Sequence, residues 1–157
     1  MDLFHSRLLP ADRETVWRAL NDPQHLCAAI PGCESIERIG ENEYRVTMMA
    51  AVGPVRTRFT GRLRLADVVP PESYTLTFEG EGGAAGFVKG AARVQLTAEG
   101  DGTRLDDTVS AQVGGRLAQA GQRLIDAAAG RIAEEFFTTF SSRLAAAPAI
   151  VSNEPSR

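Results

Sequence analysis

Gly80, Gly82 and Ala85 stand at the G-x-G-x-x-A spacing of a phosphate-binding loop, within the segment GEGGAAGFVKGAARVQL (80–96). In a dinucleotide-binding fold, such a loop leads into a helix whose N-terminus holds the pyrophosphate. Residues 87–94 alternate like a strand instead, and no Gly-Lys-Ser/Thr motif follows. We therefore expect no nucleotide site, and two interpretations of the segment stay open: a loose hairpin, or the mobile lip of a cavity.

The other residues that could do chemistry do not form a recognisable set. The chain has only two histidines, His5 and His25, and two cysteines, Cys27 and Cys33, which we expect to be reduced thiols. A metal site would need more ligands at closer spacing. Asp107 is the one carboxylate that falls on an inward register, and we expect it to be exposed near the start of its strand. The sequence therefore predicts no metal, no cofactor and no enzymatic activity.

Composition indicates one soluble globular domain. The chain has 157 residues, of which 43% are apolar and 24% charged, and its net charge of −3 does not indicate a nucleic-acid partner. No stretch approaches the roughly 18 apolar residues of a membrane span, and the N-terminus does not resemble a secretory signal. We predict a single domain over residues 1–147, a disordered tail over 148–157, and a cytoplasmic location.

Short alternating segments dominate the elements that would position these residues. A first strand, Leu3–Leu9, precedes two short helices that begin after Asp12 and Asp22. Six further strands are separated by glycine, proline and asparagine turns. They are Glu34–Ile39, Glu43–Val52, Val55–Val68, Ser73–Gly80, Gly86–Ala98 and Thr103–Val113.

The apolar period then changes to that of a helix. From Arg116 to Leu144, apolar residues recur every three or four positions, which predicts one amphipathic helix of about 30 residues. The fold class is therefore α+β: a curved, seven-stranded antiparallel sheet wrapped on a long C-terminal helix, with two short helices after the first strand.

Three glycine-containing corners are expected at one end of the sheet. Successive turns of a meander alternate between its two ends, and the helix would begin at this same end. Together the corners could ring an opening, so we predict a cavity mouth there. Its residues would be Gly53, Pro54, Gly82, Gly83, Gly86, Gly114 and Gly115.

Small residues face each other across the predicted interior. Gly121 and Gly130 lie in the predicted helix, and Gly90 and Ala92 lie on the inner face of a strand. Glycine inside a helix costs about 1 kcal/mol relative to alanine, so these glycines indicate a packing or functional reason. Either the helix packs closely on the sheet, or space is left for an apolar guest.

Arginines fill the outward positions of the third of the six strands. Arg56, Arg58, Arg62 and Arg64 alternate with inward residues. One interpretation is an ordinary polar face balanced by Glu79 and Glu81 of the next strand. The other is a surface for an anionic membrane or a partner protein.

Four segments carry a family resemblance. They are NDPQHLCAAIPGCESIE (21–37), VGPVRTRFTGRLRL (52–65), GEGGAAGFVKGAARVQL (80–96) and VGGRLAQAGQRLIDAAAGRIAEEFF (113–137). Together they resemble the carbon monoxide dehydrogenase G-subunit family, within the START/Bet v 1-like (SRPBCC) superfamily. The resemblance implies the helix-grip fold, with an apolar cavity under the long helix and with residues 80–96 and 113–124 as cavity mouth and helix start.

The resemblance also implies a function. Its members are non-enzymatic accessory proteins of molybdenum hydroxylases such as carbon monoxide dehydrogenase, and link the enzyme to the membrane by recruitment or by handling a lipid-soluble quinone. We expect a bound quinone or lipid, transient contact with the inner face of the membrane, and no nucleic acid. The alternatives are a pure docking subunit without a ligand and a cyclase- or hydrolase-like enzyme. The expected ligand-binding residues are Met48, Phe59, Phe78, Phe87, Leu117, Gly121, Leu124 and Ala128.

Overall fold

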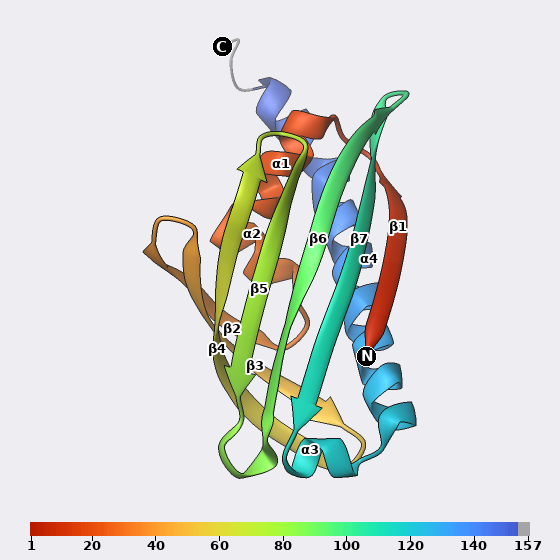
Figure 1. Cartoon of the computed structure of the whole chain (residues 1–157). Coiled ribbons are helices and arrows are strands. Elements are labelled where there is room, and N and C mark those ends of the chain that lie inside the picture. Colours follow the sequence, from red (N-terminus) through yellow and green to blue (C-terminus); the bar gives the residue numbers. More distant parts are fainter. Residues whose placement is uncertain (154–157) are drawn as a thin grey trace.

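A curved antiparallel sheet grips one long helix in the computed structural model of the chain, which describes the backbone of residues 1–153 and the side chains of residues 1–146 (Figure 1). The elements in chain order are β1 (Asp2–Leu9), α1 (Arg13–Leu20), α2 (Pro23–Ala29), β2 (Cys33–Gly40), β3 (Glu43–Val52), β4 (Val55–Val69), β5 (Ser73–Glu81), a 3₁₀ turn (Gly83–Ala85), β6 (Phe87–Glu99), β7 (Gly102–Gly114), α3 (Arg116–Gln119) and α4 (Gln122–Asn153).

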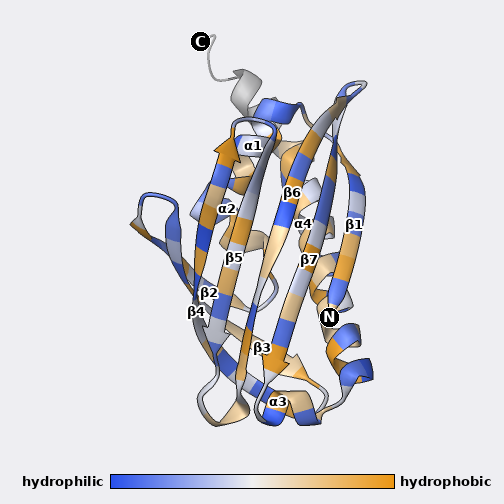
Figure 2. Cartoon of the chain, in the orientation of Figure 1, coloured by the Kyte–Doolittle hydropathy of each residue, from blue (hydrophilic) through white to orange (hydrophobic). Residues whose placement is uncertain are grey.

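The sheet has the predicted seven strands, and their order is β1-β7-β6-β5-β4-β3-β2. All neighbours are antiparallel, so β2 to β7 form a meander and β1 closes against its last strand. Figure 2 shows hydrophobic and hydrophilic residues alternating along the strands. In β4 the arginines are exposed while Phe59 is buried and Leu63 and Leu65 are half-buried, which confirms the predicted register.

Two groups of buried side chains fill much of the interior. The first lies under α1, α2 and the C-terminal part of α4, where Leu9, Val16, Phe140 and Leu144 are fully buried. The second lies at the opposite end of the sheet, under α3 and the start of α4. Its members are Val52, Phe59, Leu117, Ile125 and Ala128.

The sequence predicts one continuous helix from Arg116 to Leu144, but the structure has two helices there, α3 and α4. They are divided at Gly121, whose φ of +97° ends α3 and lets the chain turn into α4. Gly121 is therefore a hinge between two helices and not a small residue inside one. The second helix continues to Asn153, beyond the predicted end, and residues 154–157 of the predicted tail lie outside the described part of the chain.

The glycine corners gather at one end of the sheet, as predicted, and pack closely (Figure 1). Gly86 and Gly115 both have positive φ. A Cβ on Gly86 would lie 2.1 Å from the Gly114 carbonyl oxygen, and one on Gly115 would lie 2.6 Å from the Gly86 Cα. These glycines let the β5–β6 hairpin and the start of α3 touch, which agrees with the hairpin interpretation of this segment.

Candidate ligand-binding site

An interior cavity of about 420 Å³ lies between the concave face of the sheet and α4. Its wall is formed by side chains from β1, β3 to β7, α1 and α2, and its helical side includes Ala129, Ile132, Ala133 and Phe136. The volume falls in the usual range of small-molecule sites, roughly 300–1,000 Å³. This space therefore has the size of a ligand site.

Short side chains on both walls leave the cavity open. Ala129 and Ala133 present only methyl groups from α4, and Ala92 and Ala111 do the same from β6 and β7. A close-packed interior would have larger side chains at some of these positions. Of the two explanations for small residues in this interior, open space holds at Ala129 and Ala133, which line the cavity. Close packing holds at the adjacent Ala128, which belongs to the second buried group.

A polar row crosses this otherwise apolar wall. His5 of β1 is opposite Asp107 of β7, Asp107 is opposite Val94 of β6, and Val94 is opposite Tyr74 of β5. All four side chains line the cavity, and Tyr44 is the one further polar residue among those that do. The sheet thus brings an imidazole, a carboxylate and a phenol to one level of the cavity.

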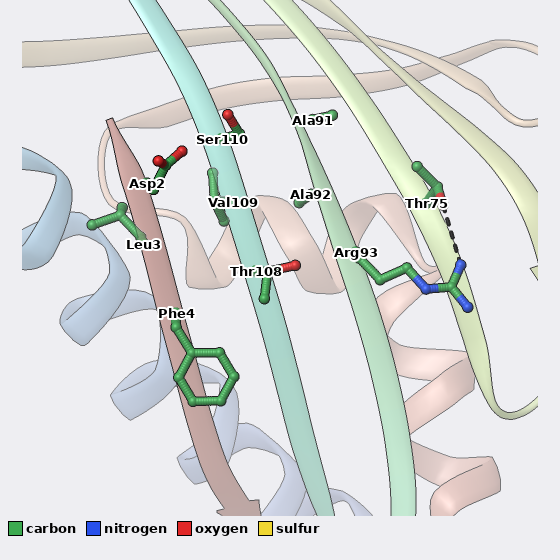
Figure 3. A pocket seen from close by; sticks show the side chains of 10 residues that line it. All are labelled: Asp2, Leu3, Phe4, Thr75, Ala91, Ala92, Arg93, Thr108, Val109 and Ser110. Atoms are coloured by element: carbon green, nitrogen blue, oxygen red, sulfur yellow. Dashed lines mark hydrogen bonds between the residues drawn. The ribbon is translucent and has the colours of Figure 1, made fainter.

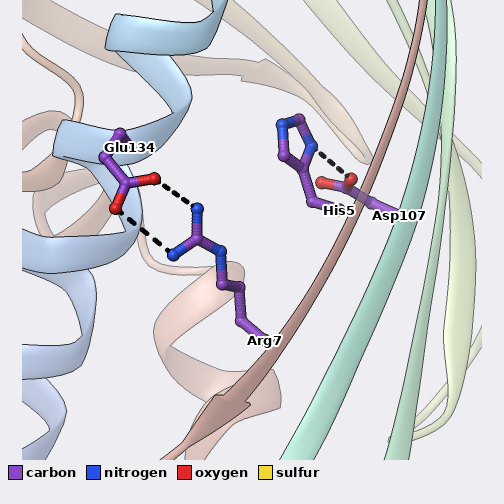
Figure 4. A network of polar contacts seen from close by, with 4 residues as sticks. All are labelled: His5, Arg7, Asp107 and Glu134. Atoms are coloured by element: carbon purple, nitrogen blue, oxygen red, sulfur yellow. Dashed lines mark hydrogen bonds and ion pairs between the residues drawn. The ribbon is translucent and has the colours of Figure 1, made fainter.

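Asp107 is largely buried, so the expectation that it would be exposed is wrong. Its side chain is 16% exposed, and its Oδ1 lies 2.8 Å from His5 Nδ1 (Figure 4). Burial raises the pKa of this carboxyl, and the hydrogen bond to His5 partly offsets the effect. Asp107 is buried because it lies inside β7, beside His5 of the paired strand β1, on the face that lines the cavity.

Tyr74 is also buried and lines the cavity, and its hydroxyl makes no hydrogen bond to any described residue. Its ring packs edge-on against Trp17 at 5.5 Å between centroids. Burial raises the pKa of Tyr74, and the nearby charge of Asp107 adds to this. By contrast, the Tyr44 hydroxyl accepts a hydrogen bond from Arg38 Nη2 at 3.1 Å. Tyr74 therefore presents a free polar group to the cavity.

Neither His5 nor Tyr74 was among the predicted ligand-binding residues, although the alternation along the strands indicates which residues face inward. Along β1, residues 3, 5, 7 and 9 share one face, and the buried Leu9 identifies that face as the inner one. The same alternation along β7 places Asp107 with the buried Leu105. Alternation predicts which face each residue lies on, but it does not predict that β1 pairs with β7 and places His5 opposite Asp107.

The predicted ligand-binding residues are divided between three places. Phe78 lines the cavity. Phe59, Leu117 and Ala128 are buried in the second group, where Met48 packs against them. Gly121, Phe87 and Leu124 are exposed, the last two at 40%. The structure therefore brings most of these residues together near the glycine corners, but the open space lies farther along α4.

The predicted mouth residues differ in their packing: Gly53, Pro54 and Gly83 are exposed, and Gly86, Gly114 and Gly115 approach one another closely. Gly53, Pro54, Gly82, Gly83, Gly86, Gly114 and Gly115 are all described, and the cavity wall includes none of them. Gly82 adjoins the second buried group, since a Cβ on it would lie 2.8 Å from the Phe59 ring. A smaller hollow of about 190 Å³ does adjoin the cavity, because Ile132 lines both, and it is bordered by Pro31, Gly32 and Arg131.

A second large hollow, about 550 Å³, lies on the sheet beside strands β1, β5, β6 and β7 (Figure 3). Its outer-face side chains include the exposed Phe4 and Arg93, and Arg93 Nη1 donates to the Thr75 hydroxyl at 3.2 Å. Thr108 lies between Phe4 and Arg93 in the strand register, and the neighbouring row holds the short side chains Ala91 and Ser110. This open surface hollow encloses a guest less than the interior cavity does.

The arginines of β4 pair with different glutamates from those expected. Arg58 makes a two-point contact with Glu34 at 2.9 and 3.1 Å. Arg62 and Arg64 both approach Glu43, at 3.6 and 3.3 Å. The partners thus belong to β2 and β3, and not to β5 where Glu79 and Glu81 lie. Three of the four arginines of β4 therefore have a carboxylate partner, and Arg56 has none among the described residues.

The described residues contain no cluster of three or more His, Cys, Asp or Glu side chains that could hold a metal ion. Cys27 and Cys33 are free, with their sulfur atoms 2.7 Å apart, and burial together with the Cys27 thiol raises the pKa of Cys33 to about 12. Within residues 1–153, no helix has both the length and the apolar character needed to cross a membrane.

Comparison with known proteins gives one family and several similar structures. The family model that describes the G subunit of carbon monoxide dehydrogenase (CoxG) matches residues 8–145. No curated protein matches the sequence. A conserved protein from Geobacillus kaustophilus is 34% identical, with a TM-score of 0.86 over 92% of this chain and 95% of its own.

More distant structures share the fold alone. A protein from Thermus thermophilus is 20% identical, with a TM-score of 0.69 over 94% of this chain and 99% of its own. The Zhui aromatase/cyclase from Streptomyces sp. R1128 is 14% identical, with a TM-score of 0.67 over 92% of this chain and 93% of its own. The architecture is the helix-grip, Bet v 1-like fold that the sequence analysis expected.

Proposed function

The chain belongs to the carbon monoxide dehydrogenase G-subunit (CoxG) family, and on this premise we propose that it is a non-catalytic accessory protein that carries a hydrophobic ligand. The ligand is a membrane quinone or another lipid, and the partner is a molybdenum hydroxylase of the carbon monoxide dehydrogenase type. The protein works in the cytoplasm and contacts the inner face of the membrane transiently.

The observation that carries this proposal is the interior cavity. It encloses about 420 Å³ and its wall is apolar apart from His5, Tyr44, Tyr74 and Asp107. Transfer of apolar surface from water into such a space gains about 25 cal/mol per Å². An isoprenoid or acyl chain therefore has a favourable place to leave water without needing a charged partner.

The experiment is solvent extraction of the purified full-length protein, followed by mass spectrometry of the extract. We expect a quinone or lipid at close to one molecule per chain, before or after incubation with membrane lipids. An extract that stays empty after this incubation would contradict the carrier function.

The docking alternative uses the surface and not the cavity. Arg58, Arg62 and Arg64 already pair with glutamates, which weakens the case for this face as an anion-seeking surface. Charge reversal at Arg56 and Arg58 followed by a pull-down of the hydroxylase tests the alternative. A charge-reversed variant that no longer pulls down the hydroxylase but still binds its ligand fully would favour a separate docking role.

A cyclase- or hydrolase-like enzyme is the second alternative, and the His5–Asp107 pair is the observation in its favour. A carboxylate that orients a histidine is a common arrangement for a general base. The extraction experiment also tests this alternative, because a carrier returns its ligand chemically unchanged after prolonged incubation.

A further inference from the structure

We propose that Tyr74 and His5 form a hydrogen-bonding anchor inside the cavity, which selects ligands that carry a carbonyl or hydroxyl oxygen on a ring. This inference rests on the proposed carrier function and adds to it the chemistry of the ligand's headgroup. Within the cavity wall, the anchor distinguishes an oxygenated ring from a pure hydrocarbon of the same shape.

The position of the two residues follows from the pairing of four strands. His5, Asp107, Val94 and Tyr74 occupy one cross-strand row on the inner face, so their side chains leave the sheet at one level. Curvature of the sheet directs such side chains toward the interior, where all four line the cavity. Asp107 lies close enough to Tyr74 for its charge to affect that phenol.

Each of the two residues has one polar atom left over. The Nδ1 atom of His5 is engaged by Asp107 at 2.8 Å, and its Nε2 atom points away from the carboxylate (Figure 4). No described residue makes a hydrogen bond with this Nε2 or with the Tyr74 hydroxyl. When Nδ1 donates to the carboxylate, neutral His5 presents Nε2 as an acceptor, and Tyr74 presents a donor.

An acceptor and a donor in an apolar wall fit a specific ligand chemistry. A ring carbonyl accepts from the Tyr74 hydroxyl, and a ring hydroxyl donates to His5 Nε2. Tyr74 is 5% exposed, so a hydrocarbon occupying the cavity would leave its hydroxyl without water or any other partner. Sites built around such a group reject analogues that lack the matching oxygen.

The experiment compares two probes with the same ring system. Menadione carries two ring carbonyls, and 2-methylnaphthalene has none. Equilibrium dialysis of each against the full-length protein gives the two dissociation constants. We expect wild type to prefer menadione by about tenfold, as a net gain of about 1.4 kcal/mol from hydrogen bonding would give.

The decisive variant is Tyr74→Phe, which removes only the hydroxyl. We expect it to weaken menadione binding by about three- to tenfold and to leave 2-methylnaphthalene binding unchanged. Tyr44→Phe is the matched control, because the Tyr44 hydroxyl already accepts from Arg38, and it should keep the wild-type preference. The double variant His5→Phe/Asp107→Val replaces both partners of the pair at once. It should keep the menadione preference, because a carbonyl cannot donate to Nε2, and should weaken binding of 1-naphthol, whose ring hydroxyl can, by about three- to tenfold. Unchanged 1-naphthol binding would remove His5 from the anchor.

The outcomes separate the anchor from the carrier function. Equal binding of both probes to wild type, or an unchanged preference in Tyr74→Phe, would overturn the anchor while the cavity function stands. Binding of neither probe would overturn the proposed cavity function and the anchor with it.

Discussion

Arg7 of the edge strand β1 and Glu134 of helix α4 form a two-point ion pair, in which Arg7 Nη2 and Nη1 lie 2.5 and 3.4 Å from the two carboxylate oxygens (Figure 4). The Arg7 guanidinium carbon also lies 5.2 Å from the centroid of the Phe137 ring. This contact joins the strand that carries His5 to the helix that forms the opposite wall of the cavity.

Glu134→Gln tests how much the pair contributes to stability. The Glu134 side chain is 62% exposed, so water and salt screen the attraction strongly. We expect a urea midpoint only slightly below that of wild type at low salt and indistinguishable from it at 1 M salt. Glu135→Gln is the control, since Glu135 makes no ion pair among the described residues. A large loss that persists at high salt would show that the contact is structurally essential.

Ala129→Leu tests whether the cavity on α4 holds the ligand. The larger side chain extends into open space, so the fold should tolerate it with an unchanged or slightly higher urea midpoint. Menadione binding in equilibrium dialysis should fall at least tenfold. Ala127→Leu, on the exposed side of the same helix, should bind menadione like wild type. Unimpaired binding to Ala129→Leu would place the ligand elsewhere.

Leu144→Ala tests the first buried group of side chains. Leu144 is fully buried, and removing its side chain leaves a cavity in a packed region. We expect a loss of about 2–5 kcal/mol in the free energy of unfolding from urea titration. Leu124→Ala is the comparison, because Leu124 is 40% exposed, and should cost clearly less. Similar costs for the two variants would contradict the assignment of the core.

The half-buried His25 should make the free energy of unfolding fall on mild acidification. Burial against Phe140 and the charge of Arg143 lower the pKa of His25 below its ordinary value of 6.5, while Asp22 opposes the effect. Below pH 6.5 the unfolded chain therefore binds a proton that the folded chain resists, and stability falls as pH falls. Urea titrations at pH 7.5, 6.5 and 5.5 should show this decline.

The control for the pH prediction is His25→Gln, which removes the titrating group. Its stability should change less than that of wild type between pH 7.5 and 5.5. Parallel curves for the two proteins would assign the decline to other groups.

The sheet was predictable from the sequence because alternation repeats over many residues. β4 shows this best, since its predicted bounds, Val55–Val68, differ from the observed Val55–Val69 by one residue. The cavity was harder to predict, because its position depends on where large side chains fill the interior and where they leave space. Phe59 of β4 and Ile125 of α4 belong to the same buried group near the glycine corners, and the periodicity of neither element predicts this grouping.

Gly121 and Gly130 are the two glycines of the predicted continuous helix, and replacing each with alanine should have opposite effects on stability. Gly121 has a φ of +97°, which an L-residue adopts only under strain, so Gly121→Ala should lower the free energy of unfolding by about 1 kcal/mol. Gly130 lies inside α4 and is exposed, and an added Cβ there would meet nothing within 4 Å. Gly130→Ala should therefore raise the free energy of unfolding by about 0.5–1 kcal/mol. Urea titration of both variants and of wild type measures the change in the free energy of unfolding for each. Stabilisation by both substitutions would indicate that the helix runs unbroken through Gly121.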